Sequence, residues 1–224
     1  MGAIRSYLTG KLLRLKVSSR WDAASRDDER FRRRRYTSYE AYLEHQRAKL
    51  ARIDLSAYDR EYRRVLAARL GDLEGVRRGA SVLCLAARLG TEVKAFIDVG
   101  CFAVGIDLNP GTVNAYVLHG DFHHLQFADG SADVVFTNSL DHCYDVQRVL
   151  GEVRRVLVPG GTFIVEAVRG ADEGVAPMFY ESFSWATIGD LVACIEAAGF
   201  TCRTRRSFDA PWGGEQLCFK TLPA

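Results

Sequence analysis

From residue 80 onward, short apolar runs alternate with helical patterns, and this alternation constrains the fold more than any other feature of the sequence. The runs are almost continuously apolar, as expected for strands that are buried on both faces of a sheet. Helices between such strands connect parallel neighbours. Strands are expected over 80–86, 101–107, 115–121, 132–139 and 162–168, and helices over 90–100, 146–161 and 184–200.

Two further runs, 201–208 and 214–222, can close the sheet as a final pair. The sequence therefore predicts a largely parallel α/β sheet in three layers. Because sheets of this kind bind ligands at the carboxyl ends of their strands, the residues that follow each strand are the first candidates for a functional site.

The first third of the chain has a different charge balance from the rest. Residues 1–70 hold 18 Lys and Arg against 9 Asp and Glu, whereas residues 71–224 hold 12 against 19. Such asymmetry suggests an appendage with its own docking role. We therefore divide the chain into a basic helical N-terminal cap, 1–75, and a main domain, 76–224.

Three helices are expected in the cap. Residues 3–17 give a basic amphipathic helix, which could pack on the main domain, pair two copies of the chain as a homodimer, or contact a membrane surface peripherally. Thr37 with Glu40, and Ser56 with Asp59, have capping-box spacing. These two pairs predict one helix running to about Leu50 and another that follows it.

Composition also excludes several classes of protein. No run of about 18 apolar residues exists, so no transmembrane segment is expected. The six cysteines lack paired spacing and accompanying histidines, so neither a disulfide framework nor a zinc site is predicted, and no metal is expected. A reducing, cytoplasmic location is the natural interpretation. The cysteines are Cys84, Cys101, Cys143, Cys194, Cys202 and Cys218.

Polar groups follow four successive strands of the predicted sheet. Asp107 follows the second strand and is well placed to accept hydrogen bonds from two ribose hydroxyls. Asp121 and Phe122 follow the third strand and suit an adenine pocket. The alternative for each aspartate is a turn or helix cap. The four groups are 86–90, 107–109, 121–124 and 138–142.

The loop "AARLG", 86–90, separates the candidate cofactors. A nicotinamide or flavin dinucleotide needs glycines there, because the backbone must approach the pyrophosphate. Arg88 obstructs that approach. A cofactor with an adenosine and an amino-acid carboxylate but no phosphate has less need of the space, and Arg88 could help to hold its carboxylate. S-adenosylmethionine is such a cofactor.

The stretches "VLCLAARLGTEV", "GIDLNP", "GDFHHLQFADGSADVVFTNSLDH" and "EVRRVLVPGGTFIVEA" resemble class I S-adenosylmethionine-dependent methyltransferases of the methyltransferase domain 11 type. The resemblance covers about 80–168. It implies an enzyme with a Rossmann-like, seven-stranded, mostly parallel sheet, helices on both faces and an antiparallel last strand. With the N-terminal helical cap, this is the expected architecture.

The resemblance also implies which residues contact S-adenosylmethionine. Carried over by position, they are Ala86, Ala87, Arg88, Gly90, Asp107, Leu108, Asp121, Phe122, Asn138, Ser139 and Leu140. The sequence departs from the family at Cys84, where an acidic residue is common, and at Ala86 and Arg88, where glycines are common. The stretch 108–114 leaves room only for a turn where the family has a full helix, so that edge is open or covered by another element, such as the cap.

His142 lies just past the fourth strand, where a methyl acceptor should meet the methyl group. Its imidazole could take a proton at neutral pH, and Asp141 could orient it or serve instead. The alternative is that His142 caps a helix or packs locally. Residues 169–185 form a long, aromatic connection, so Phe179, Tyr180, Phe183 and Trp185 are expected at the substrate, with core packing as the alternative.

Three functions compete. The leading one is O-methylation of a small-molecule acceptor such as a sugar, glycoconjugate or specialised metabolite. The second is a nucleic-acid methyltransferase that uses "RFRRRRY", 30–36, for phosphate contacts; a net acidic catalytic domain and the absence of "NPPY" disfavour it. The third is a non-catalytic binding or scaffold subunit on the same fold, which the missing glycines encourage.

Overall fold

The computed structural model describes residues 29–48 and 56–221. Its centre is a seven-stranded sheet in the order β4-β3-β2-β5-β6-β9-β8. The first five of these strands are parallel, whereas β9 runs antiparallel to both of its neighbours. The predicted sheet with an antiparallel last strand is therefore confirmed. The strands are β2 (Ser81–Leu85), β3 (Phe102–Asp107), β4 (Val117–His119), β5 (Ala132–Thr137), β6 (Leu157–Ala167), β8 (Phe200–Phe208) and β9 (Gly214–Thr221).

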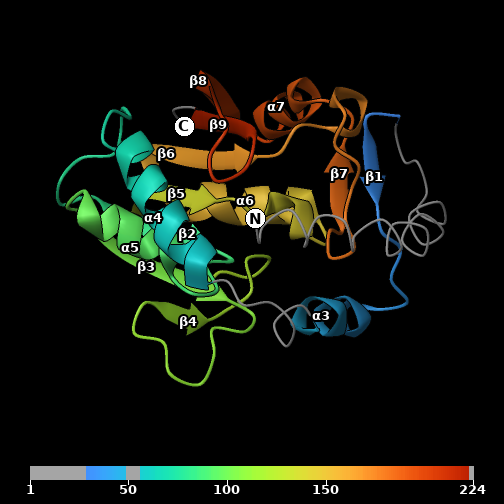
Figure 1. Ribbon diagram of the computed structural model, residues 1–224, viewed down its shortest axis with the longest axis horizontal. Coiled ribbons are helices and arrows are strands. Elements are labelled where there is room, and N and C mark those ends of the chain that lie inside the picture. The colour runs from blue at the N-terminus through green and yellow to red at the C-terminus, as the bar shows by residue number, and fades with distance from the viewer. Residues whose placement is uncertain (1–28, 49–55, 222–224) are drawn as a thin grey trace.

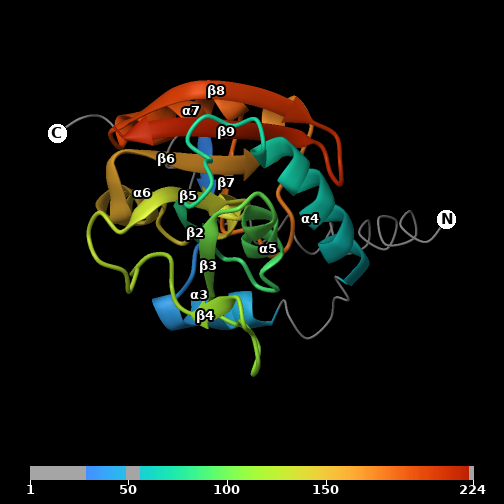
Figure 2. The same ribbon diagram turned by 90° about the vertical axis from the view of Figure 1, so that its left-hand side faces the viewer.

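Helices cover both faces of this sheet (Figures 1 and 2). Helices α4 (Ser56–Leu70) and α5 (Thr91–Asp98) lie on one face, and α6 (Val146–Val156) and α7 (Ile188–Ala197) lie on the other. Strand β5 shows how the sequence builds both cores: Val134 and Phe136 pack with α4 and α5, whereas Val135 packs with α6 and α7. This follows from the two-residue period of a strand.

A second, two-stranded sheet joins the N-terminal region to the connection after β6. Strand β1 (Phe31–Arg33) pairs antiparallel with β7 (Phe183–Trp185). The helix expected over 184–200 is wrong at this place, because Ser184 and Trp185 belong to β7. Phe31 stacks on Phe183 at 5.5 Å between ring centroids, and this contact holds the pair together.

Helix α7 begins only at Ile188, after the pair of strands. Thr187 is its N-cap and forms a reciprocal capping box with Asp190. The polar pattern that starts the helix is therefore present in the sequence, three residues later than the predicted start.

Helix α3 (Tyr39–Arg47) lies beyond the carboxyl ends of the parallel strands (Figure 1). It is the helix expected from Thr37, but its N-cap is Ser38, whose side chain accepts from the Ala41 amide. The chain from β3 to β4 contains no helix, as the sequence predicted. The predicted amphipathic helix 3–17 lies outside the described residues. Within the described ranges, no helix combines the length and apolar character needed to cross a membrane.

Candidate cofactor-binding site

A cleft that is open to solvent lies where the parallel strands β2, β3 and β5 end. Loops after these strands form one side, and α3 supplies the other. The short 108–114 stretch leaves no room for a helix after β3, so this edge of the site was expected to be either open or covered by another element. Helix α3 lies at this edge. The lining residues are Tyr42, Gln46, Ala86, Arg88, Asp107, Leu108, Asn109, Gly120, Phe122, Ser139 and His142.

The loop after β2 keeps a left-handed backbone at three alternate positions. The φ angles are 54° at Ala86, 35° at Arg88 and 74° at Gly90. Residues with a Cβ atom rarely adopt such angles, because the side chain crowds the backbone. The turn is held by hydrogen bonds from the Ala87 amide to the Ile106 carbonyl, 2.9 Å, and from the Gly90 amide to the Ala87 carbonyl, 2.6 Å. The chain therefore builds the turn with alanine and arginine where glycine would be unstrained.

The carboxylate of Asp107 connects this loop to the loop after β3. One oxygen accepts from the Arg88 amide at 3.1 Å, and the other accepts from the Asn109 amide at 2.7 Å. Each carboxylate oxygen can accept a second hydrogen bond. Because Asp107 also lines the cleft, its remaining acceptor positions suit a ligand with two adjacent hydroxyl groups.

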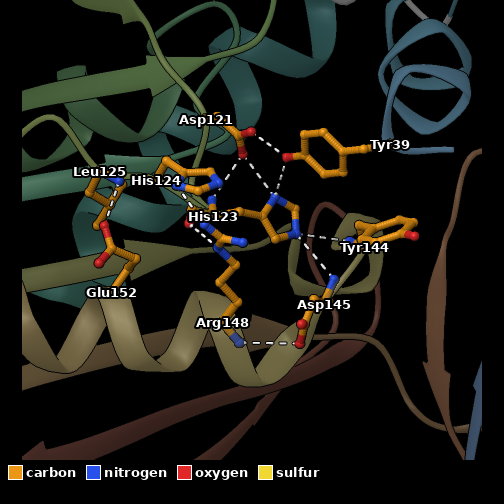
Figure 3. Close-up of polar contacts among 9 residues, drawn as sticks. All are labelled: Tyr39, Asp121, His123, His124, Leu125, Tyr144, Asp145, Arg148 and Glu152. Atoms are coloured by element: carbon orange, nitrogen blue, oxygen red, sulfur yellow. Dashed lines mark hydrogen bonds and ion pairs between the residues drawn. The ribbon is translucent and has the colours of Figure 1, made fainter.

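Asp121 is held by the protein itself (Figure 3). Its carboxylate accepts from the Tyr39 hydroxyl and, at 2.8 Å, from Nδ1 of His123. His123 is 1% exposed, and its Nε2 accepts from the amides of Tyr144, at 3.0 Å, and Asp145, at 3.2 Å. A nitrogen that accepts carries no proton, so the ring is neutral with its proton on Nδ1.

These contacts set the charge of Asp121. Burial alone would raise the pKa of its carboxyl, but hydrogen bonds from His123 and Tyr39 outweigh burial and lower that pKa to about 2. Burial, together with the hydrogen bond to Asp121, raises the pKa of the Tyr39 hydroxyl well above its usual value. An ionised Asp121 thus ties α3 to the end of β4. The adjoining residues Gly120 and Phe122 form the cleft wall here.

His142 lies on a single 3₁₀ turn, Leu140–His142, directly after β5. Its Nδ1 is 2.8 Å from the Tyr180 carbonyl oxygen, which can only accept, so Nδ1 carries the proton. Nε2 is then the basic nitrogen of the neutral ring. Asp141 Oδ1 lies 3.9 Å from it, near enough to stabilise a protonated imidazole. His142 lines the cleft. Asp141 thus lies beside the same ring nitrogen that could receive a proton.

The four aromatic residues expected at a substrate separate into two pairs. Phe179 and Tyr180 pack against His45 of α3, with ring centroids at 5.2 and 5.6 Å, and Gln46 donates to the Tyr180 carbonyl. Phe183 and Trp185 lie in the core, 1% and 4% exposed. None of the four lines the cofactor cleft.

Asn138 joins a buried polar network instead of lining the cleft. Its amide donates to Glu92, at 2.9 Å, and to the Tyr62 hydroxyl, at 3.0 Å; Tyr62 in turn donates to Glu166. Burial raises the pKa of the Glu92 carboxyl to about 7. Leu140 is buried in the core, and neither Ala87 nor Gly90 lines the cleft.

Sequence reasoning did not identify three residues that line the cleft: Tyr42, Gln46 and Gly120. Tyr42 and Gln46 belong to a helix that capping spacing predicted, but that spacing says nothing about where the helix docks. Gly120 sits beside Ile106 and Gln126, so a side chain there would meet both. Across the described residues, no group of three metal-binding side chains comes together.

Comparisons with known proteins give the fold and a domain signature. Residues 83–165 match the family model described as "Methyltransferase domain". The chain is 29% identical over 118 residues to a probable S-adenosylmethionine-dependent methyltransferase of Mycolicibacterium smegmatis, covering 46% of this chain and 45% of the relative. It is 30% identical over 105 residues to the sterol 24-C-methyltransferase erg6 of Schizosaccharomyces pombe, covering 40% of this chain and 28% of the relative.

Among solved structures, the chain is similar to the 1,6-didemethyltoxoflavin-N1-methyltransferase of Burkholderia thailandensis, with bound 1,6-didemethyltoxoflavin and S-adenosylhomocysteine. The TM-score is 0.60 at 17% identity, over 88% of this chain and 98% of that one. Identity at this level shows the fold alone. The chain spans less than half the length of the two curated relatives, so their activities do not transfer to it directly.

Proposed function

We propose that this chain, a class I S-adenosylmethionine-dependent methyltransferase by its domain match and its fold, methylates an oxygen atom of a small molecule. The observation that carries the proposal is the cleft at the strand ends. There Asp107 offers carboxylate oxygens, Phe122 offers a ring, and His142 offers a basic nitrogen within one cavity.

The cleft residues fit S-adenosylmethionine chemically. Asp107 would accept from the two ribose hydroxyls, and Phe122 would pack on the adenine base. The guanidinium of Arg88 would attract the amino-acid carboxylate, and Ser139 would meet the methionine portion. When bound, the cofactor supplies an electrophilic methyl group on a positive sulfur, which leaves as a neutral thioether. Tyr42 and Gln46 of α3 exclude water from the opposite side.

The acceptor oxygen must lose a proton during methylation, and His142 takes it. Nδ1 already carries a proton toward the Tyr180 carbonyl, so the incoming proton goes to Nε2. Asp141, at 3.9 Å, stabilises the resulting imidazolium. Aligning the acceptor with the methyl carbon accounts for the rest of the catalysis. Sugars, glycoconjugates and specialised metabolites in a cytoplasmic setting remain the proposed acceptors.

The basic run 30–36 gives little support to nucleic-acid methylation. Phe31–Arg33 form strand β1, and Arg34 is 8% exposed and donates to the Phe179 carbonyl at 2.6 Å. These residues serve the fold around β7. A free basic ribbon, as phosphate binding requires, is not formed by this part of the run.

Calorimetry with S-adenosylmethionine and with S-adenosylhomocysteine tests the proposal. We expect both to bind the intact chain, and Asp107→Ala to weaken binding at least tenfold, because two hydrogen bonds to a charged group are lost. Asp209→Ala, at an exposed position in the loop after β8, is the matched control. If neither compound binds the unaltered chain, the methyltransferase proposal is wrong and a scaffold role is favoured.

A further inference from the structure

Glu92 is a buried carboxyl group that the proposed chemistry does not use. It lies in the first turn of α5, directly after the loop 86–90, and it is 7% exposed. Its Oε1 accepts from the side-chain amide of Asn138 at 2.9 Å. Its Oε2 is buried and has no hydrogen-bond partner among the described residues. Such an atom destabilises the folded chain, so a residue that keeps it calls for a functional explanation.

A chain of hydrogen bonds leads from Glu92 to the wall of the cofactor cleft. The amide nitrogen of Asn138 donates to Glu92, and the amide oxygen of Asn138 accepts from the Ser139 hydroxyl at 2.9 Å. Ser139 lines the cleft. Two side chains therefore connect the Glu92 carboxyl to the part of the cleft that we assign to the methionine portion of the cofactor.

Glu92 is the member of this buried cluster that can change its charge near neutral pH. Burial above all, and to a smaller extent the charges of Glu166 and Asp107, raise the pKa of its carboxyl to about 7. Glu166 itself is paired with Arg69 at 2.9 Å. Burial raises the pKa values of the neighbouring tyrosine and cysteine side chains, so they stay neutral. The titratable groups that face Glu92 are Tyr58 and Tyr62 of α4, Cys84 of β2, Asp107 of β3 and Glu166 of β6.

From this arrangement we propose that Glu92 is a positioning residue for the cofactor, and that its charged carboxylate favours the methyl donor over the demethylated product. The inference rests on the proposed function. S-adenosylmethionine carries a positive charge on its sulfur, whereas S-adenosylhomocysteine, which has lost the methyl group, does not. A negative charge buried behind the cleft wall attracts the positive sulfur, because the protein interior screens charges less than water does. The same charge gives the product no such advantage, which favours its release.

The direction of the pH dependence follows from the titration of Glu92. The carboxyl gains its negative charge as pH rises through about 7. The affinity for S-adenosylmethionine should therefore rise over this range relative to the affinity for S-adenosylhomocysteine. By linkage, binding of S-adenosylmethionine near neutral pH should release protons from Glu92.

Calorimetry with both compounds on the full chain, at about pH 5.5 and about pH 8, tests the inference without turnover. The ratio of the S-adenosylhomocysteine Kd to the S-adenosylmethionine Kd should rise about fivefold with pH in the unaltered chain. Glu92→Gln keeps the size of the side chain and an oxygen for Asn138 but removes the charge, so it should abolish this rise. Titration of the ligands and of His142 is common to both proteins and cancels in the comparison. Glu61→Gln, exposed on α4, is the matched control and should behave as the unaltered chain does.

Proton release gives a second measurement. When calorimetry is repeated at neutral pH in phosphate and in Tris, the unaltered chain should release more protons than Glu92→Gln on binding S-adenosylmethionine, and the same number on binding S-adenosylhomocysteine. A purely structural role would weaken both compounds in parallel in Glu92→Gln and leave the pH response of their ratio unchanged. That outcome contradicts the inference and leaves the proposed function intact. If neither compound binds the unaltered chain, the proposed function is wrong and the inference falls with it.

Discussion

Ala86 and Arg88 adopt backbone angles that glycine adopts without steric cost, and each does so beside the cofactor cleft. Such strain is retained where the surrounding structure over-determines it, which is common at binding sites. The two residues differ in what their side chains reach. Ala86 ends in a methyl group, whereas the Arg88 guanidinium is the cation that we assign to the cofactor carboxylate. Strain and function can therefore be separated at these positions.

Replacing each residue by glycine distinguishes the effect of backbone strain from the contribution of the side chain. Ala86→Gly should stabilise the chain by about 1 kcal/mol, through relief of the left-handed strain, with cofactor affinity unchanged. Arg88→Gly should give a similar stabilisation but weaken S-adenosylmethionine binding several-fold. Urea denaturation and calorimetry measure the two effects. Ala87→Gly, where φ is not positive, should destabilise the chain; if Arg88→Gly leaves affinity intact, Arg88 does not hold the carboxylate.

Glu92 makes stability depend on pH. Its carboxyl titrates near pH 4.5 in an unfolded chain and near 7 in the folded one, chiefly because of burial. Between these values the folded state binds a proton that the unfolded state has released, so stability falls as pH rises from about 4.5 to 7. Glu92→Gln mimics the protonated form. It should match the unaltered chain at pH 5 and exceed it by about 2–3 kcal/mol at pH 8.5. Equal unfolding free energies at pH 8.5 would show that the Glu92 carboxyl titrates normally.

Helices and strands could be predicted from the sequence wherever one short pattern decides them. The residues Val146, Val149, Leu150 and Val153 mark the apolar face of α6, and all are buried. Strand β7 could not be predicted, because Phe183 and Trp185 are strand residues only through pairing with β1, some 150 residues earlier. The position of α3 could not be predicted either, because it depends on a hydrogen bond from Tyr39 to Asp121, 82 positions away.

The hydrogen bond from Tyr39 to Asp121 is expected to hold α3 in place. Tyr39→Phe removes the hydroxyl that donates to Asp121 and should raise hydrogen exchange in Tyr39–Arg47, at a cost of about 1–2 kcal/mol. Cofactor affinity should fall too, because Tyr42 and Gln46 lose their fixed positions at the cleft. Tyr144→Phe is the matched control, since Tyr144 lies in the same aromatic cluster but contributes its amide. Unchanged exchange in α3 would contradict the role given to Asp121.

At the scale of the whole molecule, the described part of the region before residue 75 packs against the main sheet. Tyr62, Leu66 and Leu70 of α4 are fully buried in the same core as β2 and β5. The positions of the cleft residues follow from strand order, so Asp107, Phe122, Ser139 and His142 could be placed from the sequence. Asn138, Asp121 and Phe183 could not, because each contacts a partner from a distant part of the chain, which is Tyr62, Tyr39 and Phe31 respectively.

The β1–β7 pair joins the N-terminal region to the connection after β6. Phe31 stacks on Phe183, which is buried in the core. Phe31→Ala should therefore destabilise the chain by about 2–3 kcal/mol, because a half-buried ring and its stacking partner are lost. It should leave S-adenosylmethionine affinity within twofold, since Phe31 does not line the cleft. Phe102→Ala, on β3 and 76% exposed, controls for loss of an aromatic ring and should change neither stability nor affinity. A tenfold loss of S-adenosylmethionine affinity in Phe31→Ala would mean that β1 supports the cleft as well as the β1–β7 pair.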